Sequence, residues 1–426
     1  MTASHISLFN LAVYLYDEGY YDSFKARTEE KVLTGMVQGF CNSALVKQGL
    51  VFHQAESRIF DMGSGPCDTS LLYYLSTGFK CAKVTVRAVD ENAQYVGGQD
   101  LATREHTTYL KSDAYRNFQV AQKEFNARGI ELDFRSSQGD AFNGQSVANV
   151  SVENDVTPNS FDMAFLSHLF YHVAPKDGLS SEQRLDNALN DVARNILKKE
   201  GIAVAYHVAI GEKDDNYSFQ YFRDNFGSKS SSVALHSNTD AMDTKDPATK
   251  IERSCVKQGI TCRTLRVNTK LHFSDELFDD TGKIKNDVKA IFKNPDRYQE
   301  LLKTPELYQD LKSIYFIVQR SANEMSADKS ETGLDNLMEK ILDVIQDTSD
   351  EYGHHLIMHE KMQLITNPER PIEIQEKVDA VLQEVESQMG ILYEAAAKKF
   401  FERGQHQGLI NQAETSAKVV RSAIAE

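Results

Sequence analysis

The chain has 426 residues, of which 41% are hydrophobic, and its formal net charge is −15. This length predicts two or three folded domains. The acidic balance argues against a general nucleic-acid surface, because phosphate contacts depend on Lys and Arg. No apolar run approaches 18 residues, so we expect no membrane span and a cytoplasmic protein. The five cysteines are scattered without a C-x-x-C spacing, which indicates neither a disulfide framework nor a zinc ribbon.

Three regions differ in their hydrophobic pattern. Residues 1–56 place apolar side chains at roughly helical spacing, and residues 57–210 alternate strand and helix patterns, as in a parallel, doubly wound sheet. From about residue 321 the spacing is helical again and acidic residues outnumber basic ones. We therefore expect a helical N-terminal lid at 1–56, an α/β domain at 57–320 and a helical C-terminal module at 321–426.

The most informative segment of the chain is a glycine turn at residues 58–70. Apolar residues lead into Asp61-x-Gly63-x-Gly65, and helix-forming residues follow. This pattern predicts a strand, a tight turn and the start of a helix, since glycine lets the backbone turn sharply and lets a ligand approach closely. The spacing differs from the G-x-G-x-x-G fingerprint of dinucleotide-binding proteins.

Four further segments follow in a characteristic order. The apolar run 84–90 ends in Asp90, whose carboxylate could accept two hydrogen bonds from a ribose diol. A turn follows at 139–142, a strongly apolar strand is predicted at 160–168, and a helix, a glycine stop and a further strand are predicted at 196–206.

Together these five segments resemble the motifs of class I S-adenosylmethionine-dependent methyltransferases. The resemblance covers residues 58–210 and implies a seven-stranded, doubly wound, Rossmann-like α/β sheet, with S-adenosyl-L-methionine as cofactor. It places the glycine turn along the methionine part of the cofactor, Asp90 at the ribose and Asp140 at the adenine amine. The implied cofactor-binding residues are Asp61, Gly63, Ser64, Gly65, Asp90, Glu91, Asp140, Ala141, Phe142 and Ser167.

The end of the sheet is predicted from two β-rich runs, 261–267 and 313–319. In this family the last two strands form an antiparallel hairpin. The helical region at 321–426 is not required by the family core. We expect it to be a separable unit for partner binding, dimerisation or localisation, or alternatively a bundle that only supports the sheet.

The segment after the fourth strand, Ser-His-Leu-Phe-Tyr-His-Val at 167–173, bears on the subclass. The Asn/Asp-Pro-Pro-aromatic motif of nucleic-acid amino-methylating enzymes is absent, and so are the metal-binding acids of catechol-type enzymes. The candidate catalytic residues are His168, Tyr171 and His172, because a histidine near the methyl group could accept a proton. His355 and His359 have an i, i+4 spacing, but we expect them to be solvated helix residues and predict no metal site.

A second, narrower resemblance concerns residues 15–24. This segment is similar to the N-terminal substrate-binding segment of histamine N-methyltransferases. It implies an amine pocket walled by Tyr20 or Tyr21 and by Phe24, with Glu29 or Glu30 anchoring the substrate. The family's amide side chain after strand four is replaced here by Ser167-His168. The three aromatic residues could equally be ordinary core residues.

These patterns predict an enzyme that transfers a methyl group by in-line substitution to a small-molecule acceptor, an amine in the form implied by the second resemblance. One alternative is a protein methyltransferase that docks its substrate on the C-terminal helices. Another is a non-catalytic scaffold with a methyltransferase fold.

Overall fold

The structure is a computed structural model, and it describes a large part of the chain. The described residues are 26–50, 55–75, 81–99, 104–143, 159–170, 173, 175–209, 247–286, 288, 304, 306–307, 309–314, 317, 340–370 and 372–424. For 208 and 402–424 only the backbone is described. Tyr20, Tyr21, Phe24, Tyr171 and His172 therefore lie outside the described residues.

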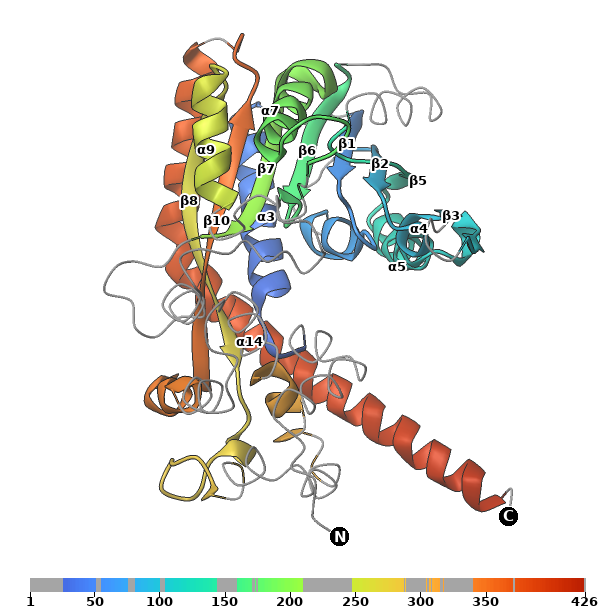
Figure 1. The fold of residues 1–426 in the computed structure, drawn as a ribbon, viewed down its shortest axis with the longest axis vertical. Coiled ribbons are helices and arrows are strands. Elements are labelled where there is room, and N and C mark those ends of the chain that lie inside the picture. The colour runs from blue at the N-terminus through green and yellow to red at the C-terminus, as the bar shows by residue number, and fades with distance from the viewer. Residues whose placement is uncertain are drawn as a thin grey trace.

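A twisted sheet of seven strands forms the centre of the fold (Figure 1). Its order is β5 (Glu131–Gln138), β2 (Lys83–Asp90), β1 (Glu56–Met62), β6 (Phe161–Ser167), β7 (Leu197–Val208), β10 (Gly353–Thr366) and β8 (Thr261–His272). The pairs from β5 to β7 are parallel, whereas β10 is antiparallel to both β7 and β8. This mixed α/β sheet is typical of class I methyltransferases and confirms the predicted fold class.

The central strands are nearly continuous apolar runs because both of their faces are covered. In β6, every residue from Phe161 to Leu166 is buried, and Ser167 is the first to reach partial exposure. Strand β2 likewise buries Val84 through Val89 and ends in the partly exposed Asp90. The two polar residues therefore mark the carboxyl edge of the sheet, where ligands bind in open α/β folds.

Helices cover both faces of the sheet (Figure 1). One core contains side chains from α3 (Glu30–Lys47), η1 (Thr69–Tyr74), α5 (Asp113–Ala127) and α14 (Ile372–Ile424). The other contains side chains from α7 (Ser181–Asp191), η4 (Val192–Ile196) and α9 (Pro247–Lys257). The shorter elements are α4 (Ala93–Val96), β3 (Gly98–Gln99), β4 (His106–Thr107), η2 (Tyr109–Lys111), η5 (Asp275–Leu277) and β9 (Ser349–Asp350). No helix in the described ranges is both long and apolar enough to cross a membrane.

The last strand of the sheet is not where the sequence predicts it. Residues 311–314 and residue 317 are helical, so the predicted strand at 313–319 is wrong. The strand is instead β10, which begins at Gly353 and carries His355 and His359. Both histidines are buried, so their assignment as solvated helix residues is also wrong. Strand preference depends on packing context more than on residue type, and β10 is held by two neighbouring strands.

The C-terminal region is joined to the sheet through β10. Strand β8 pairs only with β10 among the described strands, and β10 also pairs with β7. After β10, α14 packs on α3, burying Val378, Val381 and Val385. Figure 1 shows the far end of α14 projecting away from the sheet. These contacts argue against separating 321–426 from the domain before it.

We predict that a chain ending at residue 325 will not fold cooperatively. Removing β10 exposes the edges of β7 and β8, and removing α14 exposes the apolar face of α3. The expected product is insoluble or binds the dye ANS without a cooperative thermal transition. A matched chain ending at residue 401 keeps β10 and the buried α14 residues in the described part, and it should unfold cooperatively. A folded 1–325 fragment would show that the C-terminal region is an independent unit.

Candidate functional site

The glycine turn after β1 forms at the expected place. Gly63 and Gly65 have φ angles of +63° and +54°, a region that L-residues other than glycine rarely adopt. A Cβ atom on Gly63 would lie 2.1 Å from Leu169 Cδ1, so glycine is also required by close packing. No atom lies within 4 Å of the corresponding position at Gly65. The turn therefore packs against the segment after β6 at its first glycine and is open at its second.

Asp90 joins the end of β2 to this turn. The Gly65 N–H donates to Asp90 Oδ2 and the Asn92 N–H donates to Asp90 Oδ1, both at 2.8 Å. Ser64 N–H donates to the Val89 carbonyl at 3.0 Å. Because each carboxylate oxygen has two lone pairs, Asp90 can still accept hydrogen bonds from a ligand. The structure thus brings Asp90 and the turn together, and Glu91 follows with an exposed side chain.

Asp61 lies in β1, two residues before Gly63, and is only 5% exposed. Burial raises the pKa of this carboxyl group to about 7, with the hydrogen bond from Ser70 opposing the shift and the charges of Asp90 and Asp68 adding to it. A buried carboxylate of this kind is stabilised by a positive ligand, because an opposite charge favours its ionised form.

The turn after β5 is tied to α7. Asp140 accepts hydrogen bonds from the Phe142 N–H at 2.9 Å, from Arg184 Nη2 at 2.6 Å and from Lys176 Nζ at 2.8 Å. The Arg184 guanidinium also lies 5.2 Å from the centre of the Phe142 ring. Ala141 is buried beside these groups. An adenine amine at Asp140 would share the carboxylate with two cations, which the sequence did not predict because Arg184 and Lys176 lie outside the motif.

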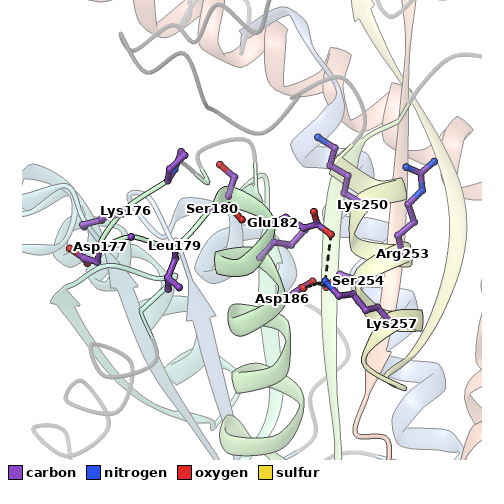
Figure 2. Close-up of a pocket in the computed structure, with 14 residues that line it drawn as sticks. Lys176, Asp177, Leu179, Ser180, Glu182, Asp186, Lys250, Arg253, Ser254 and Lys257 are labelled. Carbon is purple, nitrogen blue, oxygen red and sulfur yellow. Dashed lines mark hydrogen bonds and ion pairs between the residues drawn. The ribbon is translucent and has the colours of Figure 1, made fainter.

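A separate cavity of about 940 Å³ lies between the start of α7 and α9. Figure 2 shows its basic side chains, among them Lys250 and Arg253, together with Lys257 directed at two acidic residues of α7. Lys257 Nζ lies 2.6 Å from Asp186 Oδ2 and 3.5 Å from Glu182 Oε1. Ser254 also donates to Asp186. None of the predicted cofactor or substrate residues lines this cavity.

At the exit of β6, the backbone is held in an unusual conformation. His168 has a φ of +53°, a value uncommon outside glycine and found at sites where surrounding structure fixes the chain. Its N–H donates to the Tyr206 carbonyl of β7 at 2.9 Å. The hydroxyl groups of Ser167 and Tyr74 are 3.0 Å apart. These contacts fix the positions of Ser167 and His168.

The start of α3 is held over this exit. Thr28 forms a bridge with Leu271 at the end of β8, and Glu29 N–H donates to the Lys270 carbonyl at 3.0 Å. At the second residue of the helix, Lys31 forms an ion pair with Asp68, the N-cap residue of η1. The helix start is therefore fixed to β8 on one side and to the glycine-turn helix on the other.

Glu29 and Glu30 have different partners. Glu29 is buried, and its Oε2 lies 3.2 Å from His272 Nε2. Glu30 Oε1 lies 2.8 Å from His168 Nε2. Of the two alternative anchors predicted from the sequence, the structure therefore brings Glu30 to the strand exit and directs Glu29 to β8.

A third group completes this arrangement. Glu360 of β10 is 1% exposed, and its carboxylate lies within 4.8 Å of the side-chain ligand atoms of Glu30 and His168. Burial, together with the charge of Glu30, raises the pKa of Glu360 to about 8. Burial lowers the pKa of His168, but Glu30 and Glu360 outweigh it and raise the pKa to about 9. The sequence missed Glu360 because it was assigned to a helical region.

Among known proteins, similarity to this chain is found only at the level of solved structures. No family model matches the chain, and no curated protein sequence matches it. One similar structure is a cyclopropane-fatty-acyl-phospholipid synthase-like protein from Lactobacillus casei, at 11% identity and a TM-score of 0.36, covering 78% of this chain and 92% of that one. Another is an S-adenosylmethionine-dependent methyltransferase from Thiobacillus denitrificans in complex with S-adenosyl-L-homocysteine, at 10% identity and a TM-score of 0.30, covering 76% and 91%.

A similar methyltransferase from Geobacter sulfurreducens, also in complex with S-adenosyl-L-homocysteine, has 10% identity and a TM-score of 0.31, covering 76% of this chain and 90% of that one. At these TM-scores the likeness carries no argument about function. The fold assignment depends on the strand order and on the single antiparallel strand.

We predict that Asp61→Asn stabilises the ligand-free protein at pH 8 but not at pH 4. The folded-state pKa of Asp61, about 7, lies above the usual value of 3.8 for an aspartate. The stability that its neutral form contributes is therefore complete below about pH 4 and is lost as the pH rises through 7. Because one pKa unit corresponds to about 1.4 kcal/mol, the gain in unfolding free energy at pH 8 should exceed about 1 kcal/mol. Urea unfolding at both pH values measures it. An equal effect at both pH values would mean that folding does not raise the pKa of Asp61.

Proposed function

We propose that this protein transfers a methyl group from S-adenosylmethionine to a small-molecule acceptor. The observation that carries the proposal is the hydrogen bond between Gly65 N–H and Asp90 Oδ2, which joins a glycine turn and an acid at adjacent parallel strand ends. The chain runs outward from β1 to β2 and β5, then returns to β6 on the other side. Ligands of open α/β sheets bind at such a reversal of strand order.

The residues at this edge fit the cofactor in two respects. The open space at Gly65 and the remaining lone pairs of Asp90 suit a ribose-bearing ligand that approaches the backbone closely. The buried Asp61 carboxylate would be stabilised by the positive charge of the cofactor.

When bound, the cofactor would supply a methyl group on a positive sulfonium. The chain's own residues would orient the acceptor and limit its contact with water. The start of α3 lies beside the β6 exit, and Glu30, Ser167 and His168 present polar atoms there. Beside Glu30, the pKa of His168 is raised to about 9, which favours the protonated ring, so it would orient the acceptor as a hydrogen-bond donor. Its role as a proton acceptor remains a prediction for higher pH.

The finer proposal is that the acceptor is an amine. Glu30 supports it, because a carboxylate at the β6 exit can accept hydrogen bonds from an N–H group of the acceptor. Glu29 is already paired with His272. A panel of small amines, alcohols, thiols and peptides, assayed by mass spectrometry for a gain of one methyl group, tests the acceptor class. Methylation of peptides alone would favour the protein-methyltransferase alternative.

We predict that the chain binds S-adenosylmethionine and S-adenosyl-L-homocysteine, and that Asp90→Ala weakens both by roughly 1–3 kcal/mol, the range for losing hydrogen bonds to a charged group. Isothermal titration calorimetry measures the affinities. Asp280→Ala, which removes an exposed acid from a turn outside the site, is the matched control and should bind normally. If folded wild-type protein binds neither compound, the proposed function is wrong. An unchanged affinity in Asp90→Ala would reassign the ribose partner.

We further predict that His168→Asn slows methyl transfer at least about tenfold while changing cofactor affinity little, since orienting groups act on the reaction step. Asparagine is chosen because it tolerates the positive φ found here. Single-turnover rates and calorimetry on the same preparation separate the two effects. Equal losses in rate and cofactor affinity would place His168 in the cofactor site instead.

A further inference from the structure

We infer that Glu30, His168 and Glu360 form a binding site for one divalent transition-metal ion. The three residues come from α3, the exit of β6 and the middle of β10, and their ligand atoms all lie within 4.8 Å of one another. The inference goes beyond the proposed function, because it requires neither a bound cofactor nor a particular acceptor.

The spacing of the groups suits metal coordination. Metal–nitrogen and metal–oxygen bonds to such ligands are about 2.0–2.2 Å long, which places neighbouring ligand atoms about 3 Å apart. His168 Nε2 and Glu30 Oε1 are already 2.8 Å apart. One ligand atom from each of Glu30, His168 and Glu360 lies within 4.8 Å of the others.

The burial of Glu360 is an independent observation that points to a ligand. Its side chain is 1% exposed, and its Oε2 atom accepts no hydrogen bond from any described residue. Buried polar groups in proteins normally have a hydrogen-bond partner or hold a ligand. The buried Asp310 differs, because Arg27 Nε lies 3.0 Å from its Oδ1. Glu360 forms no ion pair with Lys or Arg within the described ranges, and it is directed at Glu30 and His168.

The backbone around the three groups is fixed in advance. Glu360 lies opposite Val208 of β7 and Val267 of β8, so strand pairing holds it from both sides. His168 is held by its backbone hydrogen bond to Tyr206, and Glu30 lies between the β8 contact of Glu29 and the Lys31–Asp68 ion pair. Rigid supporting structure is what allows a metal site to keep its geometry.

The donor set indicates the kind of ion. One imidazole nitrogen and two carboxylate oxygens suit zinc, manganese, iron(II) or cobalt, whereas calcium and magnesium favour all-oxygen sites. Three protein ligands leave at least one coordination position open, as in catalytic rather than purely structural metal sites. The open position would lie at the β6 exit, where the proposed acceptor binds.

The test is metal binding by the full chain without cofactor or acceptor. Protein treated with a chelator and then desalted is titrated with zinc, manganese and cobalt chlorides by calorimetry, and cobalt binding is followed by its visible absorption. We expect one equivalent to bind and the melting temperature to rise. Glu360→Gln and His168→Asn should each lower the metal affinity at least about tenfold. Losses of that size follow even when a residue that only hydrogen-bonds to a metal ligand is replaced.

His106→Ala and Glu351→Gln change exposed residues away from the cluster and serve as matched controls that should bind metal normally. Melting curves of the metal-free variants show whether each is folded. Binding that is absent, or that persists unchanged in both Glu360→Gln and His168→Asn, would overturn the site. The site would also be overturned if a simple primary amine bound the chelator-treated protein through Glu360 and abolished the rise in melting temperature that metal causes. Cofactor titration of the same metal-free protein reports on the proposed function separately.

Discussion

The position of β10 between β7 and β8 is the constraint on which the rest of the structure depends. Without it, β8 has no strand neighbour in the described part of the sheet, and the contact between β8 and the start of α3 loses its support. β10 also carries Glu360 to Glu30 and His168 at the β6 exit and leads into α14, which packs on α3. One antiparallel strand therefore joins the end of the chain to its N-terminal helix and to the site.

Buried acids near the strand ends show how stability and ligand binding are linked in this fold. Asp61 and Glu360 are both largely desolvated, and burial is the leading reason why their pKa values are raised. Such groups lower the stability of the fold when they ionise without a partner. A cation that binds beside them stabilises their ionised form. Natural sites commonly keep groups of this kind at some cost in stability.

The two sides of the carboxyl edge are built differently. At the ends of β1 and β2, the N–H groups of Gly65 and Asn92 donate to Asp90, so main-chain atoms at two turns create the geometry. At the β6 exit, Glu30, His168 and Glu360 come from positions far apart in the chain and meet only through tertiary contacts. Local turns give a fixed cradle for a common ligand, whereas assembled side chains can be varied to suit different acceptors.

The sequence by itself determined the α/β fold class, the glycine turn, the acid at the end of β2 and the helical character of α3 and α14. These features depend on local chemistry: on glycine where φ is positive, on apolar runs where both faces of a strand are buried, and on helical spacing where one face is buried. The order of the motifs also predicted Asp140 and His168 as site residues. It did not predict which side chains surround them.

Only the tertiary structure decided where the last strand lies, which of Glu29 and Glu30 reaches the strand exit, and that Arg184 and Lys176 hold Asp140. The run 313–319 is rich in residues that favour strands, yet its described residues Ser313, Ile314 and Ile317 are helical, whereas the His- and Met-containing run 353–366 becomes a strand because two neighbours offer it hydrogen bonds. Strand pairing and ion pairing join residues that are distant in sequence, and no local pattern records which partner each one finds.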